Sequence, residues 1–226
     1  MIKSVLGIGS GRCGTTSLAS FLNAQKTITC THERYDQRSM WYREYPLAKQ
    51  QLKSILEPKE GPIVGDVGQS YLKFIQDILD EYDTVKIICL KRDREKTINS
   101  FLKWSAARYP KWLFLQNSPT TCVVGGKLMH LTNLGLLAEW CLRRVDEQSV
   151  RVDLGNYYDD YYEHCEILEK NNGGKFKIFP TETLNTKTGM REILDFIDLA
   201  EKDMIFKKVR ANTIDNCVLG KYENGG

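Results

Sequence analysis

The sequence has no apolar run of the roughly 18 residues that a membrane-spanning helix needs. None of its seven cysteines forms a C-x-x-C pair, so neither a zinc ribbon nor a thioredoxin-type motif is predicted. Charge of one sign is not in excess either, because 32 basic residues are balanced by 29 acidic ones. A general nucleic-acid-binding face is therefore not expected.

The apolar stretch at residues 5–8 is too short for a signal peptide and is more typical of a strand that runs into a loop. The odd number and irregular spacing of the cysteines indicate reduced thiols. These features predict a cytoplasmic protein that binds neither membrane nor nucleic acid. They leave open a local basic site for a small anionic ligand, and they do not indicate an oligomeric state.

The chain has no repeats, no low-complexity stretches and no linker, so we expect one domain over residues 1–226. Apolar runs of strand length alternate with helical patterns, which predicts an α/β fold with a mostly parallel central sheet and helices on both faces. The predicted strands are 5–8, 63–67, 85–90 and 176–179. The predicted helices are 15–22, 47–56, 71–82, 94–104, 134–145, 157–169 and 188–197, with a loop over 110–126.

A glycine-rich segment, G-I-G-S-G-R-C-G-T-T-S-L at residues 7–18, joins the first strand to the first helix. Glycines let backbone N–H groups converge on an anion, and the helix N-terminus adds a partial positive charge. Hydroxyls at Thr15, Thr16 and Ser17 and the guanidinium of Arg12 extend this set of donors. The segment departs from the nucleoside-triphosphate loop G-x-x-x-x-G-K-[ST], because Thr15 stands where the lysine would be. Phosphate binding is thus predicted, and an ATP-dependent kinase is disfavoured.

A second basic element follows the strand at 85–90. Arg92 stands at the strand exit, and Ser100 lies about two helical turns further on. Arg92 can hold a phosphate with two parallel hydrogen bonds, and the Ser100 hydroxyl can point to the same side. The alternative is that Arg92 pairs with Asp93 or Glu95 at the surface.

Both elements resemble those of sulfotransferases that use 3′-phosphoadenosine 5′-phosphosulfate (PAPS). The resemblance implies a P-loop-like sulfotransferase architecture. Residues Arg12, Cys13, Gly14, Thr15, Thr16 and Ser17 would bind the 5′-phosphosulfate, and Arg92 and Ser100 would bind the 3′-phosphate. It also implies a small-molecule or carbohydrate acceptor with a hydroxyl or amine, and no metal. Family members often close a further basic loop over the 3′-phosphate, for which Arg210 is the candidate here.

Sulfuryl transfer needs a base for the acceptor and a cation for the leaving phosphate. Arg12 suits the second role as a fixed charge. Glu33 is the first candidate for the base, because carbohydrate sulfotransferases have a catalytic glutamate at a similar distance from the loop. His32 is suited by its pKa near neutrality, and Asp66 is a third candidate. A small-molecule kinase or a non-catalytic nucleotide-binding module remains the alternative function.

Overall fold

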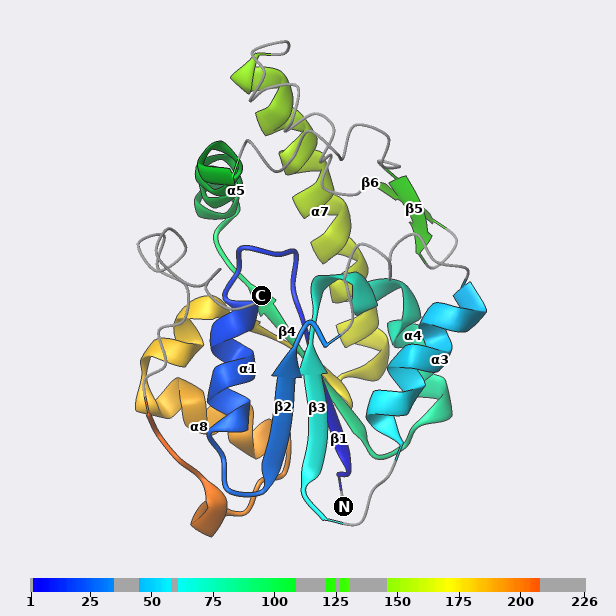
Figure 1. The fold of residues 1–226 in the computed structure, drawn as a ribbon, viewed down its shortest axis with the longest axis vertical. Helices are drawn as coiled ribbons and strands as arrows, with labels where there is room; N and C mark the ends of the chain where they lie inside the picture. The colour runs from blue at the N-terminus through cyan, green and yellow to red at the C-terminus, as the bar shows by residue number, and fades with distance from the viewer. Residues whose placement is uncertain are drawn as a thin grey trace, which may run out of the picture.

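The computed structural model describes residues 2–34, 45–57, 61–108, 121–124, 127–130 and 146–207. A five-stranded, all-parallel sheet forms its centre, in the order β2-β3-β1-β4-β7 (Figure 1). Its strands are β1 Ser4–Ile8, β2 Ile28–His32, β3 Ile63–Val67, β4 Val85–Lys91 and β7 Phe176–Pro180. The predicted α/β class with a parallel sheet is confirmed.

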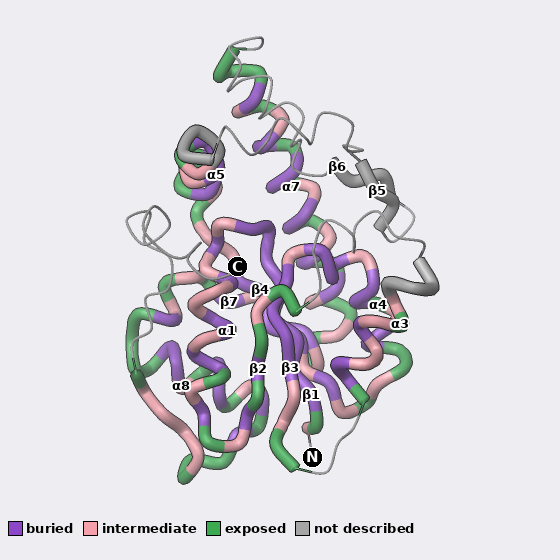
Figure 2. Tube along the Cα trace, in the orientation of Figure 1, coloured by how far each residue is buried: buried purple, intermediate pink, exposed green. Residues whose placement is uncertain are grey.

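Helices cover both faces of the sheet, as predicted. The α-helices are α1 Thr15–Asn23, α3 Tyr45–Leu56, α4 Ile75–Glu81, α5 Arg94–Arg108, α7 Glu147–Asn172 and α8 Lys187–Phe196. Side chains of α1 and α8 share one buried apolar cluster with one face of the sheet. Those of α3, α4, α5 and α7 form a second cluster on the opposite face. The central strands β1 and β4 are buried between these two layers (Figure 2), which explains why β4 is an almost continuous apolar run.

Several elements differ from the sequence-based prediction. Residues 121–130, assigned in part to a loop, contain an antiparallel pair, β5 Thr121–Val124 and β6 Lys127–His130. The helix predicted over 71–82 begins as the 3-10 helix η1, Gln69–Phe74, before α4. Helix α7 begins ten residues before the predicted 157, at Glu147. The helix predicted over 134–145 lies outside the described residues.

Asp146 explains the early start of α7. Its side chain accepts a hydrogen bond from the backbone N–H of Ser149 at 2.9 Å, which caps the helix. Two short 3-10 helices complete the described chain, η4 Thr181–Asn185 and η5 Glu201–Asp203. Among the described helices, none combines the length and the apolarity that a membrane span requires.

The strand register brings the carboxyl ends of four strands to one edge of the sheet. Gly7 of β1 and His32 of β2 both pair with Val67 of β3, and Ile8 pairs with Cys89 of β4. The loops that follow these strands therefore start at the same level. Parallel α/β sheets bind ligands beyond this edge, and those sequence-predicted site residues that the structure describes lie at or near it.

Candidate active site

The loop after β1, residues 9–14, winds tightly from the strand into α1. Gly11, Arg12 and Gly14 have φ angles of 82°, 53° and 98°, in the left-handed region. Glycine adopts this region without penalty, whereas a residue such as Arg12 loses about 1 kcal/mol there. Gly14 is the N-cap of α1, so no side chain caps the helix and its positive end is directed at the loop.

The loop is packed so closely that a methyl group at Gly9 would not fit. A Cβ there would lie 2.3 Å from the Cys13 Sγ and 2.9 Å from the carbonyl oxygen of Leu90. We expect Gly9→Ala to lower the free energy of unfolding by about 1–3 kcal/mol, measured by urea denaturation. Gly174→Ala is the matched control, since a Cβ there has no neighbour within 4 Å. Equal stability of the two variants would contradict the close packing.

The structure brings together the two basic elements that the sequence predicted. Arg12 donates from Nε to the hydroxyl of Ser100 at 3.3 Å, and its guanidinium lies 5.6 Å from the ring centre of Trp104. Arg92 donates from Nη1 to the carbonyl oxygen of Arg12 at 2.9 Å. Two guanidinium groups and a hydroxyl thus gather beside the N-terminus of α1, in an arrangement that can bind two phosphate groups of one ligand.

His32 lies against the first turn of α1. Its Nε2 is 3.2 Å from the Thr15 hydroxyl and 3.3 Å from the Thr16 hydroxyl. The ring is half-buried, and its burial lowers its pKa below 6.5, although nearby Asp66 acts in the opposite direction. At neutral pH the imidazole is therefore uncharged and can accept a proton.

The lowered pKa of His32 predicts a pH-dependent stability. Below about pH 6.5 the unfolded chain binds a proton at this residue more readily than the folded protein does. The stabilising contribution is therefore complete above that pH and is lost as the pH falls through the folded pKa. We expect wild type to lose more stability than His32→Gln between about pH 7 and about pH 5, measured by urea denaturation. Parallel losses would contradict the lowered pKa.

The other two candidate bases differ in their surroundings. Glu33 is exposed and has a φ of 51°, with its N–H bonded to the carbonyl oxygen of Val67 at 3.0 Å. Asp66 is fully buried, and its carboxyl group accepts hydrogen bonds from Thr31 Oγ1 at 2.8 Å and Arg34 N at 3.1 Å. The hydroxyl of Tyr71 also donates to Asp66. Asp66 therefore joins the residues on either side of His32 and Glu33 to the neighbouring strand.

The remaining predicted site residues are distributed as follows. Cys13 is buried, and burial raises its pKa to about 11, so its thiol stays protonated. Its carbonyl oxygen accepts a hydrogen bond from the Thr181 hydroxyl at 2.6 Å. Ser17 is half-buried in the first turn of α1. Arg210 lies outside the described residues.

Four tyrosines of α7, Tyr157, Tyr158, Tyr161 and Tyr162, also reach this edge of the sheet, and no function was predicted for them from the sequence. The hydroxyls of all four donate to backbone carbonyls at the ends of strands or just after them. The acceptors are Ser10 after β1, Gln69 after β3, and Leu90 and Arg92 at the end of β4. The available signal was the repeat Y-Y-D-D-Y-Y at residues 157–162, which places the four rings on adjacent turns of one helix face.

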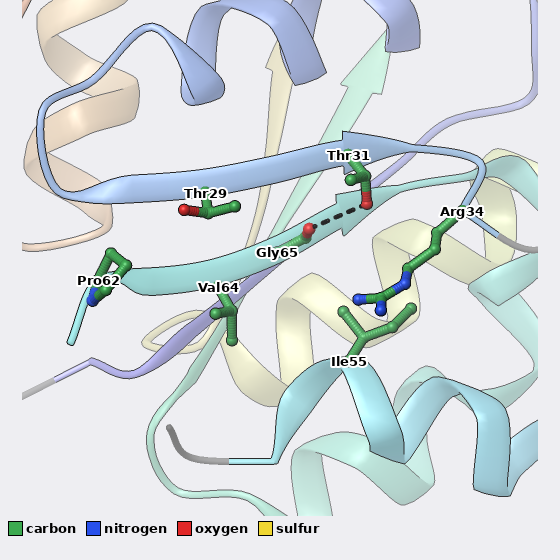
Figure 3. Close-up of a pocket in the computed structure, with 7 residues that line it drawn as sticks. All are labelled: Thr29, Thr31, Arg34, Ile55, Pro62, Val64 and Gly65. Atoms are coloured by element: carbon green, nitrogen blue, oxygen red, sulfur yellow. Dashed lines mark hydrogen bonds between the residues drawn. The ribbon is translucent and has the colours of Figure 1, made fainter. Parts of the chain in front are cut away.

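A pocket of about 280 Å³ lies between β2, β3 and α3 (Figure 3). Its lining consists of Thr29, Thr31, Arg34, Ile55, Pro62, Val64 and Gly65. Because adjacent strand residues point to opposite faces, this pocket opens on the face of β2 opposite His32. The strands thus separate it from the Gly-rich loop.

Within the described residues, no group of three histidine, cysteine or carboxylate side chains is placed to hold a metal ion.

Comparison with known proteins supplies independent findings. The profile of a family described as "Sulfotransferase domain" matches residues 4–173, which include both basic elements. The crystal structure of a sulfotransferase from Alicyclobacillus acidocaldarius is similar, with a TM-score of 0.52 and 13% sequence identity. The alignment covers 95% of this chain and 87% of that chain, and at this identity it is evidence of the fold alone. No curated protein sequence matches.

Proposed function

The chain belongs to the sulfotransferase domain family, and on that premise we propose that it transfers a sulfuryl group from PAPS to a hydroxyl or amine acceptor. The convergence of Arg12, Arg92 and Ser100 at the N-terminus of α1 is the observation that carries this proposal. Arg12 is 80 positions from Arg92 and 88 from Ser100 in the sequence, yet it is in direct hydrogen-bond contact with both. PAPS has phosphate groups at two ends of one ribose, which suits a site with two adjacent anion-binding groups.

The donor would lie across the carboxyl edge of the sheet. Thr15, Thr16 and Ser17 would donate hydroxyl hydrogen bonds to the phosphosulfate at the positive end of α1. Arg92 and Ser100 would bind the 3′-phosphate. The residue types fit the ligand, because arginine binds phosphate oxygens in pairs and a helix N-terminus stabilises negative charge.

His32 is the base that we propose. The acceptor oxygen or nitrogen attacks sulfur, the new bond forms as the bond from sulfur to the phosphate oxygen breaks, and the acceptor proton moves to His32 Nε2. That atom lies beside the two threonine hydroxyls that would hold the sulfonate, and it is uncharged at neutral pH. Arg12 would stabilise the charge that develops on the leaving phosphate.

Glu33 and Asp66 have different proposed roles. Exposed Glu33 is the alternative base and can also contact the acceptor, a small molecule or carbohydrate. Asp66 would act indirectly. Its hydrogen bonds to Thr31 and Arg34 fix the turn that contains His32 and Glu33.

Calorimetric titration with adenosine 3′,5′-bisphosphate tests the donor. We expect this nucleotide, the product that PAPS leaves after sulfuryl transfer, to bind without added metal and more tightly than adenosine 5′-phosphate, which lacks the 3′-phosphate. ATP with Mg²⁺ is the comparison ligand. If ATP binds and the bisphosphate does not, the PAPS proposal fails and a kinase becomes the better explanation.

A further inference from the structure

Four tyrosines on one face of α7 form a buried row under the candidate site. Tyr157 and Tyr161 lie on successive turns, as do Tyr158 and Tyr162, and the four rings contact one another with centroids 4.5–5.9 Å apart. Their exposed fractions are 6% or less. We call Tyr157, Tyr158, Tyr161 and Tyr162 the tyrosine row.

The hydroxyls of the tyrosine row contact the backbone at or just after the ends of three strands, β1, β3 and β4. Tyr157 donates to the Ser10 carbonyl oxygen at 2.7 Å, in the Gly-rich loop. Tyr162 donates to the Leu90 carbonyl oxygen at 2.7 Å, and Tyr158 to the Arg92 carbonyl oxygen at 2.5 Å, both at the end of β4.

Tyr161 connects the loops after β1 and β3. Its hydroxyl donates to the carbonyl oxygen of Gln69 at 3.1 Å and accepts from the N–H of Gly9 at 3.1 Å. One helix thus holds the backbone of every loop to which we assign donor contacts.

Packing alone does not explain this row. Phenylalanine would fill nearly the same volume. Each of the four buried hydroxyls, in contrast, costs free energy unless it forms a hydrogen bond. Burial also raises the pKa of Tyr158 to about 12 and the pKa of Tyr162 well above its usual value. These two hydroxyls therefore stay protonated and can donate hydrogen bonds at any physiological pH.

The row itself is held in place by contacts between α7 and α5. Asp159 accepts two hydrogen bonds from Arg94, at 2.9 and 3.0 Å, and Arg151 donates to Asn99 at 2.8 Å. The absence of a side chain at Gly155 lets Arg94 pack against α7. A Cβ at Gly155 would lie 2.1 Å from Nη2 of Arg94. Ser100 lies on α5. These contacts therefore connect the tyrosine row to one of the residues proposed to bind the 3′-phosphate.

We propose that the tyrosine row consists of positioning residues that set the separation between the two phosphate-binding groups, with Tyr157 acting on the 5′ side and Tyr158 on the 3′ side. This inference rests on the proposed function. Tyr157 acts through Ser10 and the Gly-rich loop, whereas Tyr158 acts through the backbone of Arg92. The two tyrosines should therefore affect different parts of the same ligand.

Tyr→Phe variants and two ligands test this division. We expect Tyr158→Phe to weaken binding of adenosine 3′,5′-bisphosphate about two- to tenfold, the effect of one hydrogen bond. Binding of adenosine 5′-phosphate should change by less than about twofold, because that ligand does not use Arg92. Tyr157→Phe should instead weaken both ligands by the same factor. Affinities are measured by calorimetric competition.

Gln25→Leu is the matched control for lost stability. Gln25 is buried at the opposite end of α1 and hydrogen-bonds to Phe21 and Ile205, so its loss should destabilise the protein without changing either affinity. The inference is wrong if Tyr158→Phe weakens both ligands equally, or neither. If wild type itself does not bind the bisphosphate more tightly than adenosine 5′-phosphate, the proposed function is wrong, and the inference that rests on it is wrong as well.

Discussion

Replacing Arg92 with alanine should weaken binding of adenosine 3′,5′-bisphosphate by about 30-fold or more, since losing one partner of a desolvated charge pair costs roughly 2–5 kcal/mol. The proposed site assigns the 3′-phosphate to this guanidinium, which is half-buried and also holds the Arg12 carbonyl oxygen. The loss of affinity should be much smaller for adenosine 5′-phosphate. Calorimetric titration of both ligands measures the difference.

Arg191→Ala is the control for a general loss of positive charge. Arg191 lies on α8 and pairs with Glu201 at 2.9 Å on the surface, away from the carboxyl edge of the sheet. The Arg191→Ala substitution should leave the affinities for both adenosine nucleotides unchanged. Near-wild-type binding of the bisphosphate by Arg92→Ala would remove the 3′-phosphate assignment. Equal weakening of both ligands would show that Arg92 acts only by supporting the loop through Arg12.

His32→Gln should lower kcat by about 10²- to 10⁴-fold, the usual contribution of a general base. Glutamine keeps a side-chain amide that can hydrogen-bond the Thr15 and Thr16 hydroxyls, but it cannot take a proton. The bisphosphate affinity should therefore stay close to that of wild type. Turnover is measured as release of adenosine 3′,5′-bisphosphate from PAPS, with an acceptor that supports turnover by wild type.

Glu33→Gln is the paired experiment, because it removes the alternative base from the adjacent position. We expect it to retain most of the turnover. The reverse pattern, an inactive Glu33→Gln with an active His32→Gln, would assign the base to Glu33. The pH profile gives a second readout, since activity that depends on uncharged His32 should decline only below about pH 6.5.

The sequence was sufficient for those parts of the fold that depend on local pattern. The apolar run of β4 and the glycines after β1 predicted a parallel sheet with a ligand edge. The antiparallel pair of β5 and β6 was missed because its two four-residue strands are too short for a clear alternating pattern. The start of α7 was missed although Asp146 provides a cap signal, because the apolar residues of its first turns are sparse.

The candidate site was predictable in its residues but not in its contacts. The Gly-rich loop and the Arg92 element each have a sequence pattern, and the sheet register then brings them together. The side chain of His32 faces α1 because of the register in which β2 pairs with β3. The sequence does not specify that register. Nor could spacing alone indicate that Asp66 is buried beneath the turn.

The left-handed backbone of Arg12 and Glu33 bears on how this enzyme can be stabilised. Both residues have φ angles near 50°, where glycine would be more favourable by about 1 kcal/mol. A search for heat-resistant variants would therefore favour glycine at these two positions. This change would remove the Arg12 guanidinium proposed for catalysis, together with the Glu33 carboxylate proposed to contact the acceptor. Thermal selection without an activity screen should thus lead this protein toward inactive forms, which is the usual conflict between stability and activity.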